Sequence, residues 1–224
     1  MKAYLVAHTL IDYELFGNLE YKPHVTRYWD SVSNVDELAE FAGRACYESW
    51  DRPNPATATN EGYLKHIIEV GHFSVLEHAS ATFYLTGVSR SFTHELVRHR
   101  HMSFSQLSQR YVDESEANLV LPPNGSLLEE ELIQQHHAIS LKLYDTLVEN
   151  RLAQGQTRKQ AREAGRAVLP NATETRIVVT GNMRSWRELL GKRIGPGVDA
   201  AFNENAQEIL RQLKELAPNT FQDM

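Results

Sequence analysis

The stretch SRSFTHELVRHRHMSFSQLSQRY, residues 89–111, joins a helix pattern to a dense set of hydrogen-bond donors. Residues 89–101 predict a helix. On that helix Arg90, His94 and Arg98 follow one another at four-residue steps, so they share one face. Three serines, two glutamines, an arginine and a tyrosine come after the helix. Because a guanidinium can donate two parallel hydrogen bonds, these residue types favour binding of a phosphate and a base.

Strand and helix patterns mix irregularly on both sides of this stretch. Runs of strand formers predict strands, and apolar residues at three- and four-residue steps predict helices. Because no regular βαβ repeat is present, the order favours an α+β fold over a doubly wound parallel sheet. This length supports one substantial core, so we expect a single domain, residues 1–224. The expected strands are 2–8, 80–88, 118–121 and 175–180, and the expected helices are 34–50, 60–70, 89–101, 126–152, 157–170, 183–193 and 199–216.

Capping and breaking residues set several of these boundaries. Asn34, followed by two acidic residues, predicts a helix start, and a capping box begins at Ser126. Gly71 is expected to end the second helix, because glycine favours the left-handed conformation that follows many helices. Pro53 and Pro55 predict a break between the first two helices.

Charge is distributed unevenly along a chain whose net charge is −6. Residues 90–111 carry four arginines against one glutamate, and residues 158–193 carry nine lysines and arginines against three glutamates. Two basic islands in an acidic chain favour a local site for an anionic ligand. A nucleic-acid-binding surface would more often make the whole domain basic. The remaining alternative is a solvent-exposed basic helix face.

Several classes of protein are disfavoured by composition. The sequence contains no apolar run near the roughly 20 residues that span a membrane, and no signal-peptide pattern at its start. The lone cysteine, Cys46, excludes an intrachain disulfide, and we expect it to pack on the apolar face of helix 34–50. We therefore expect a soluble cytoplasmic protein. No metal site is expected, because no cysteine pairs exist and no HExxH motif is formed by His72, His78, His94, His99 and His101.

The order Arg98-His99-Arg100, seven residues, then Ser108 resembles the RHR-x7-S signature of the flavin-dependent thymidylate synthases. The likeness extends from about Phe41 to Arg193 and is greatest to actinobacterial members. It implies mixed helices around an antiparallel sheet, and a homotetramer with active sites at subunit interfaces. The flanking stretches that carry it are residues 71–78, 167–176 and 180–182.

The resemblance also implies a site, residue by residue. FAD contacts are implied for Ser74, Arg98, His99, Arg100, Gln106, Asn182, Arg184 and Glu188. Contacts with the nucleotide dUMP are implied for Glu95, Leu96, Val97, Arg98, Gln106, Leu107, Ser108, Gln109, Arg110, Arg166 and Arg193, with Arg90 and Lys159 assisting at the phosphate. Arg193 is the implied catalytic residue, because a fixed positive charge beside the uracil ring favours its ionisation. The resemblance also implies that Tyr111 and His72 line the pocket.

The implied reaction is the reductive methylation of dUMP to dTMP. Methylenetetrahydrofolate gives the one-carbon unit, and FAD reduced by NADPH gives the hydride. Such chemistry needs no protein nucleophile, which agrees with a packing role for Cys46. Residues 194–199 lack a histidine that many relatives have there, and Glu188 stands where actinobacterial relatives often have histidine.

Two other functions fit the same stretch. One is a nucleic-acid-binding module that uses residues 98–101 for phosphates, with Phe104 and Tyr111 as stacking residues. The other is a flavin oxidoreductase with a different acceptor, for which dUMP would neither perturb the flavin spectrum nor gain a methyl group.

Overall fold

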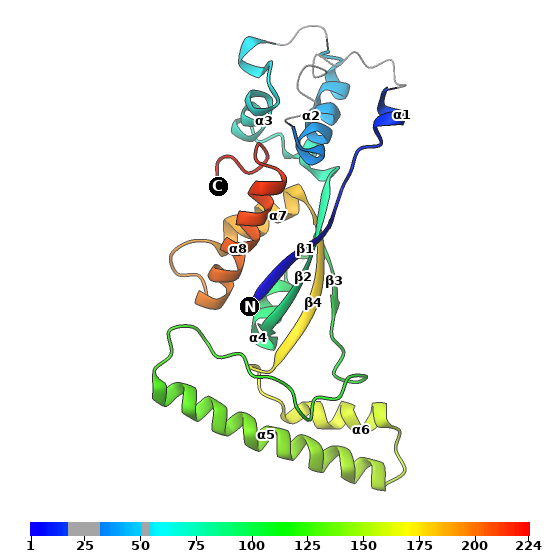
Figure 1. Ribbon diagram of the computed structural model, residues 1–224, viewed down its shortest axis with the longest axis vertical. Helices are drawn as coiled ribbons and strands as arrows, with labels where there is room; N and C mark the ends of the chain where they lie inside the picture. The colour runs from blue at the N-terminus through cyan, green and yellow to red at the C-terminus, as the bar shows by residue number, and fades with distance from the viewer. Residues whose placement is uncertain (18–31, 51–53) are drawn as a thin grey trace.

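A four-stranded antiparallel sheet runs through the centre of the computed structural model, which describes residues 1–17, 32–50 and 54–224 (Figure 1). The strand order is β1-β2-β4-β3, so the two edge strands are β1 and β3. Pro53 lies outside the described residues. The α+β prediction and the antiparallel sheet are confirmed. The strands are β1 (Lys2–His8), β2 (Ser80–Ser89), β3 (Met102–Gln106) and β4 (Glu174–Asn182).

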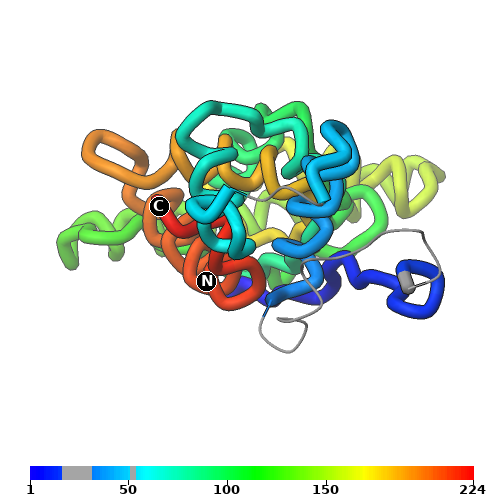
Figure 2. The backbone as a smooth tube through the Cα atoms, turned by 90° about the horizontal axis from the view of Figure 1, so that it is seen from above, coloured from blue at the N-terminus to red at the C-terminus, as the bar shows by residue number. Residues whose placement is uncertain are grey.

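Helices cover one face of this sheet and both of its ends (Figure 1). Helices α2 and α3 lie at one end, and α5 and α6 lie at the other. Seen along the long axis (Figure 2), the α5–α6 pair extends beyond the body of the molecule. The described helices are α1 (Tyr13–Gly17), α2 (Asn34–Tyr47), α3 (Asn60–Glu69), α4 (Arg90–Leu96), α5 (Leu127–Ala153), α6 (Arg158–Gly165), α7 (Met183–Arg193) and α8 (Ala200–Leu216), with 3₁₀ turns at Pro55–Thr57, Phe73–Glu77 and Arg166–Val168.

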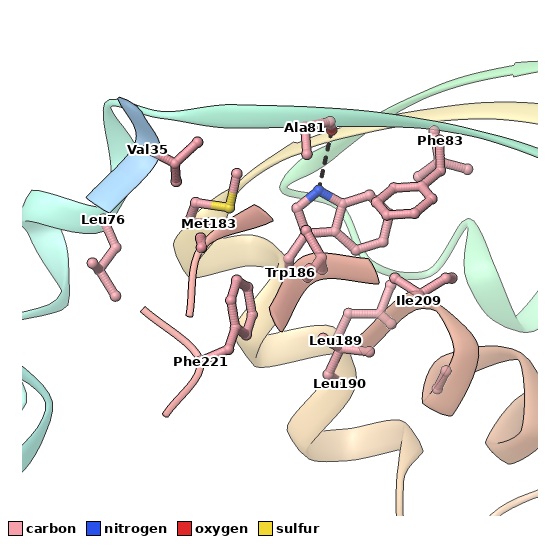
Figure 3. Packing of buried hydrophobic residues seen from close by; sticks show 14 of the residues in the cluster. Val35, Leu76, Ala81, Phe83, Met183, Trp186, Leu189, Leu190, Ile209 and Phe221 are labelled. Carbon is pink, nitrogen blue, oxygen red and sulfur yellow. Dashed lines mark hydrogen bonds between the residues drawn. The ribbon is translucent and has the colours of Figure 1, made fainter. Parts of the chain in front are cut away.

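The core forms between the sheet and helices α7 and α8. Alternate residues of β2 and β4 are buried, as expected for strands with one face on a core. Trp186 of α7 is fully buried, and its indole N–H donates to the carbonyl of Ala81 at 3.1 Å (Figure 3). Its ring meets the edge of Phe83 at a centroid distance of 5.1 Å. This packing fixes α7 against the sheet.

The predicted helix over 89–101 is too long. It ends at Leu96, because residues 102–106 form strand β3 instead. That strand pairs with β4 in the register Met102↔Gly181. A helix through residue 101 would remove the turn that lets the chain reach the sheet edge. Arg98 therefore lies beyond the helix and does not share a face with Arg90 and His94.

Other boundaries also differ from the prediction. Ser33, not Asn34, caps α2, with its hydroxyl accepting from Asp36 N at 3.1 Å. The helix ends at Tyr47 rather than near residue 50, because Glu48 adopts a left-handed conformation with φ of 45°. The expected strand at 118–121 is a single bridge between Leu119 and Thr173. The basic helix is also shorter than expected, since α6 gives way to a 3₁₀ turn at 166–168.

Cys46 does not pack in the core, contrary to the prediction. It is exposed, because residues 45–47 form the last turn of α2 and all of them face solvent. The buried face of the helix lies earlier, at residues such as Val35, Ala39 and Gly43. Cys46 lines a groove instead.

The capping box at Ser126 is confirmed, with both of its hydrogen bonds formed at the start of α5. Gly71 follows α3 with φ of 72°, which agrees with its predicted role as a helix stop. No helix in the described ranges is both long enough and apolar enough to cross a membrane.

Candidate active site

Helix α4 packs its apolar residues on the core and leaves His94 and part of Glu95 at the surface. Ser89 caps it, accepting from Phe92 N at 3.1 Å, and Phe92 and Leu96 are buried in the core. Thr93 on the same inner face accepts a hydrogen bond from Gln106 Nε2 at 2.9 Å. Glu95 is half-buried at the far end of the helix, where the chain turns toward β3.

A pocket of about 450 Å³ opens beside that end of α4, and we call it the Arg193 pocket. It lies between the α4–β3 turn and helix α7. Six of its lining residues are cationic or imidazole side chains from the turn and the end of α7, so the pocket suits an anionic or polar ligand. Its lining residues are Glu95, Arg98, His99, Arg100, His101, Met102, Ser185, Glu188, Lys192 and Arg193.

Arg193 is the most constrained side chain of this pocket. Its Nη2 donates to the carboxylate of Glu95 at 2.9 Å and to the Glu95 carbonyl at 3.4 Å. Its Nε donates to His99 Nε2 at 3.1 Å. The carboxylate of Glu95 also lies 3.7 Å from Arg98 Nη1. Glu95 therefore holds two guanidinium groups at the mouth of one pocket.

His99 is neutral in this arrangement. Its Nε2 accepts the hydrogen bond from Arg193, so the ring proton belongs on Nδ1. Burial lowers the pKa of His99, and the nearby positive charges of Arg193 and Lys192 lower it further. Protonation would remove the acceptor and place two cations side by side.

Helix α7 connects the Arg193 pocket to two smaller grooves. Glu188 lines both the pocket and a groove with Arg184, and Arg184 lines a further groove with Ser74 and Cys46. Arg184 and Glu188 are four residues apart, so they lie on one face of the helix. Each has an ionic partner: Arg184 pairs with Glu77 at 2.5 Å, and Glu188 pairs with Lys192 at 2.5 Å. Two of the cofactor candidates, Arg184 and Glu188, thus lie on one face of α7.

Asn182 has a structural role in the chain itself. Its side-chain oxygen accepts from Ser185 N at 2.8 Å and from the Ser185 hydroxyl at 2.8 Å, which caps α7. The Ser185 hydroxyl also lies 3.1 Å from the His101 carbonyl, which can share its single proton. These bonds anchor the start of α7 to the turn that carries the arginine–histidine–arginine motif. Asn182 itself is half-exposed.

A second cationic group, which we call the Arg110 cluster, gathers around α6. It consists of Arg90, Arg110, Lys159, Arg162 and Arg166. Arg110 pairs with Glu163 of α6 at 2.7 Å, and Arg162 donates to the Tyr111 carbonyl at 2.6 Å. The ammonium of Lys159 lies over the Tyr111 ring, 4.8 Å from its centroid, and lowers the pKa of that tyrosine. Burial lowers the pKa of Arg90; the charge of Glu114 raises it, and that of Arg166 lowers it.

The remaining nucleotide candidates lie between the two groups. Gln106 ends β3 and donates to Thr93 and to Thr175 at 3.2 Å, so its amide is already engaged. The Leu107 backbone N–H donates to the Arg176 carbonyl at 2.9 Å, and Ser108 is exposed. Gln109 is buried beside Glu114. Leu96 is buried in the core, so it could offer a ligand only its backbone, whereas Val97 is exposed.

Comparison with known proteins decides the family. The sequence matches the family described as thymidylate synthase complementing protein over residues 26–219. It is 57% identical over 196 residues to the flavin-dependent thymidylate synthase of Mycolicibacterium vanbaalenii, covering 83% of this chain and 78% of the relative. The enzymes of the same name from Mycobacteroides abscessus and Mycobacterium avium are 56% and 54% identical, with the same coverage.

The chain belongs to the family of flavin-dependent thymidylate synthases. The resemblance carried by the arginine–histidine–arginine motif is therefore confirmed, as is the likeness to actinobacterial members. Membership in this enzyme family argues against the nucleic-acid-binding alternative.

Some residues of the Arg193 pocket were missed from the sequence. His101, Met102, Ser185 and Lys192 line it, and each lies within two residues of a predicted site residue, so a wider window around those residues would have included them. Phe202 was also missed. Its ring lies under the guanidinium of Arg193, 4.6 Å from Cζ to the ring centroid. It falls at an ordinary apolar position of helix α8, and nothing in the sequence distinguishes it from a core residue.

The described residues include no group of three histidine, cysteine or acidic side chains that could hold a metal ion. His99 is committed to Arg193, and His101 lines the pocket without forming such a group.

Proposed function

We propose that this chain catalyses the reductive methylation of dUMP to dTMP, with 5,10-methylenetetrahydrofolate as carbon donor and FAD reduced by NADPH as hydride donor. The observation that carries this proposal is the Arg193 pocket in a member of this family. There, one arginine is aimed by a glutamate and a neutral histidine at the edge of a ligand-sized cavity. We place the enzyme in the cytoplasm, where such nucleotide synthesis would draw on its substrates.

The donor set of the chain fits a flavin dinucleotide. A dinucleotide is long and carries a diphosphate, and the candidates Arg98, Arg100 and Arg184 offer guanidinium groups at separate points along the turn and α7. When bound, the flavin supplies hydride chemistry, and the protein supplies position and charge. The proposed FAD contacts are Ser74, Arg98, His99, Arg100, Gln106, Asn182, Arg184 and Glu188, of which Arg98, His99, Arg100 and Glu188 line the Arg193 pocket.

Arg193 is the residue that we propose as catalytic. A uracil ring beside it would meet a guanidinium whose position is fixed before the substrate arrives. Such preorganised charge stabilises the negative charge that develops as the ring ionises, without reorganisation at that moment. The carboxylate of Glu95 offsets part of this charge, so we expect a nucleotide to compete with Glu95 for the guanidinium.

The Arg110 cluster is the proposed site for the phosphate of dUMP. Arg110 and Arg166 offer bidentate donors, and Arg90 and Lys159 add charge nearby. Ser108 and the backbone of residues 95–97 and 107–109 complete the proposed contacts. In the described part of one chain, none of these four cations lines the Arg193 pocket. One nucleotide is proposed to contact both the Arg110 cluster and the Arg193 pocket. We therefore favour a site that is completed by a second copy of the chain.

Helix α5 supports the proposal of a homotetramer. Its buried face, around His137, Ser140 and Tyr144, packs toward α6. An apolar stripe lies on another side of the same helix and is exposed to solvent. Because α6 does not cover this stripe, a second partner is needed to bury it. The stripe consists of Leu128, Leu132, Ile139 and Leu143, which are 65%, 55%, 58% and 47% exposed.

Anaerobic turnover tests the proposed reaction. The purified protein would be given FAD, NADPH, methylenetetrahydrofolate and dUMP carrying tritium at C5. Release of tritium together with formation of dTMP is expected. Neither product would appear if the chain were a flavin oxidoreductase with another acceptor. A Cys46→Ser variant is the control for mechanism, because it should retain turnover if no protein thiol attacks the ring.

Assembly is tested separately by light scattering on a sizing column. The wild-type chain is expected at four times its 25.5 kDa mass. Leu132→Asp places a charge in the exposed stripe of α5 and should lower the assembled fraction. His136→Asp, at an exposed polar position of the same helix, is the matched control. A wild-type monomer that turns over dUMP would contradict the shared site.

A further inference from the structure

The N–H groups of the Arg193 guanidinium differ in whether a neighbouring residue accepts a hydrogen bond from them. Its Nε–H is taken by His99, and its Nη2 by the carboxylate and carbonyl of Glu95. For Nη1, no hydrogen-bond partner is found among the described residues. Since an arginine carries five N–H donors, the two on Nη1 remain for a ligand. Arg193 keeps 20% of its side chain exposed and lines the pocket.

Phe202 supports the same guanidinium from α8. Arg193 Cζ lies over its ring at 4.6 Å, within the distance at which a cation is attracted to an aromatic face. The ring itself is fixed, because Phe202 is 1% exposed and packs against Phe92 at a centroid distance of 4.6 Å. The His99 ring lies 6.4 Å from it. A buried, immobile ring thus covers part of the arginine that the pocket presents.

The segment before α8 brings Phe202 to this position. Gly195 and Gly197 have φ of 138° and 80°, values that glycine adopts without strain, and they turn the chain back after α7. Asp199 then caps α8 by accepting from Phe202 N at 2.9 Å. Here the turn delivers an aromatic ring to the arginine.

We infer that Phe202 is a positioning residue for Arg193, holding its guanidinium against Glu95 and His99 so that Nη1 faces the pocket. The inference rests on the proposed function for the identity of the ligand, a pyrimidine nucleotide. The contacts that carry it are present without any ligand. It assigns to an apolar side chain a role in the reaction that packing alone would not give.

Fluorinated phenylalanines at position 202 test this without altering the shape of the core. Each added fluorine draws electron density from the ring face and weakens its attraction for a cation, while the side chain stays nearly the same size. We expect kcat/KM for dUMP to fall stepwise from phenylalanine to pentafluorophenylalanine, by about 5- to 30-fold in total. The decrease should lie mainly in kcat. Unchanged kinetics across the series would overturn the inference.

A second readout needs neither flavin nor turnover. In the ligand-free protein, NMR titration would follow His99, assigned by comparison with a His99→Gln variant. As the ring loses its hold on Arg193, the pKa of His99 should rise toward its ordinary value, since Arg193 helps to lower it. Lys192, Glu188 and Glu95 also act on His99 and are unchanged in this series. A constant His99 pKa would show that the ring does not hold the arginine.

The matched control is the same series at Phe83, a fully buried phenylalanine that packs on Trp186. It should change neither the kinetics nor the His99 titration. Phe202→Leu adds a size change and should reduce kcat/KM at least as far as the pentafluoro variant. If the wild-type chain makes no dTMP, the proposed function fails, and the His99 titration still decides the positioning role.

Discussion

Asp36 ties the C-terminal segment of the chain to the first turn of α2. Its side chain is fully buried, and one carboxylate oxygen accepts from Thr220 N at 2.9 Å and from the Thr220 hydroxyl at 2.6 Å. The other oxygen accepts from Asn219 N at 3.1 Å. Replacing Asp36 with alanine would leave two backbone N–H groups and one hydroxyl without an acceptor.

The size of the effect follows from these three donors. Each buried donor left unpaired lowers the free energy of unfolding by about 1–3 kcal/mol. Part of this loss is offset, because the variant no longer has to bury a carboxylate. We therefore expect Asp36→Ala to lower the free energy of unfolding by about 2–5 kcal/mol. Asp36→Asn should cost less, about 1–2 kcal/mol, because an amide oxygen can still accept from Thr220 while its NH₂ faces the Asn219 N–H.

The pH dependence gives the prediction a sign. Burial raises the pKa of Asp36, although its hydrogen bonds oppose the shift. The folded state therefore binds the Asp36 proton more tightly than the unfolded state does, and this contribution to stability is full below the unfolded pKa. That contribution is lost as pH rises through the folded pKa. The stability difference between wild type and Asp36→Asn should accordingly shrink from acid to neutral pH.

Urea unfolding at fixed protein concentration, repeated across that pH range, measures both quantities. Glu69→Gln, at an exposed position at the end of α3, controls for the loss of one acidic group. A loss below about 1 kcal/mol for Asp36→Ala, or a difference that grows toward neutral pH, would refute the reasoning.

Four further outcomes are expected. Arg193→Ala should retain FAD, followed by its absorbance, but lose about 100-fold or more in kcat; normal turnover would remove it from the mechanism. Arg110→Ala should weaken dUMP binding by about 1.5–3 kcal/mol in a calorimetric titration, and unchanged affinity would rule out the phosphate role. Gly165→Ala should cost about 1–3 kcal/mol in thermal unfolding, because the added Cβ would lie 2.9 Å from buried Tyr144. Since the pKa of His99 is lowered, its neutral form is kept above pH 6.5 and lost only as pH falls through that lower value. The acid limb of the rate profile should therefore lie below pH 6.5.

The central strands and the long helix could be predicted because their local signals agree with the fold. Strands β2 and β4 consist of strand-forming residues, and Ser126 opens a complete capping box. Strand β3 could not be predicted in the same way. It reads Met-Ser-Phe-Ser-Gln, and it is a strand because its backbone pairs with β4, a contact distant in sequence.

The candidate site, too, could be predicted from the sequence only in part. Resemblance alone linked Arg98 and His99 with Arg193, which lies 94 residues after His99, and the structure does bring these three side chains to one pocket. The exposure of Cys46 could not be seen in the sequence, because its position fits the apolar stripe of α2. Whether that stripe is covered depends on where the core ends. The contact of Phe202 with Arg193 likewise depends on how α8 folds back over α7.

The early end of α4 explains why one chain presents two cationic groups and not one. A helix through residue 101 would have placed Arg90 and Arg98 on a single face, as the sequence predicted. Because the helix stops at Leu96, Arg90 stays near Arg166 at its start, and Arg98 turns toward Arg193 beyond its end. The two groups need a bridging ligand or a second copy to act together. The exposed apolar stripe of α5, a helix that packs against α6, is the surface on which we propose that the second copy docks. An assembled enzyme would then join phosphate recognition from one subunit to ring activation by Arg193 of another. In that case, loss of assembly should abolish turnover even when every site residue is intact.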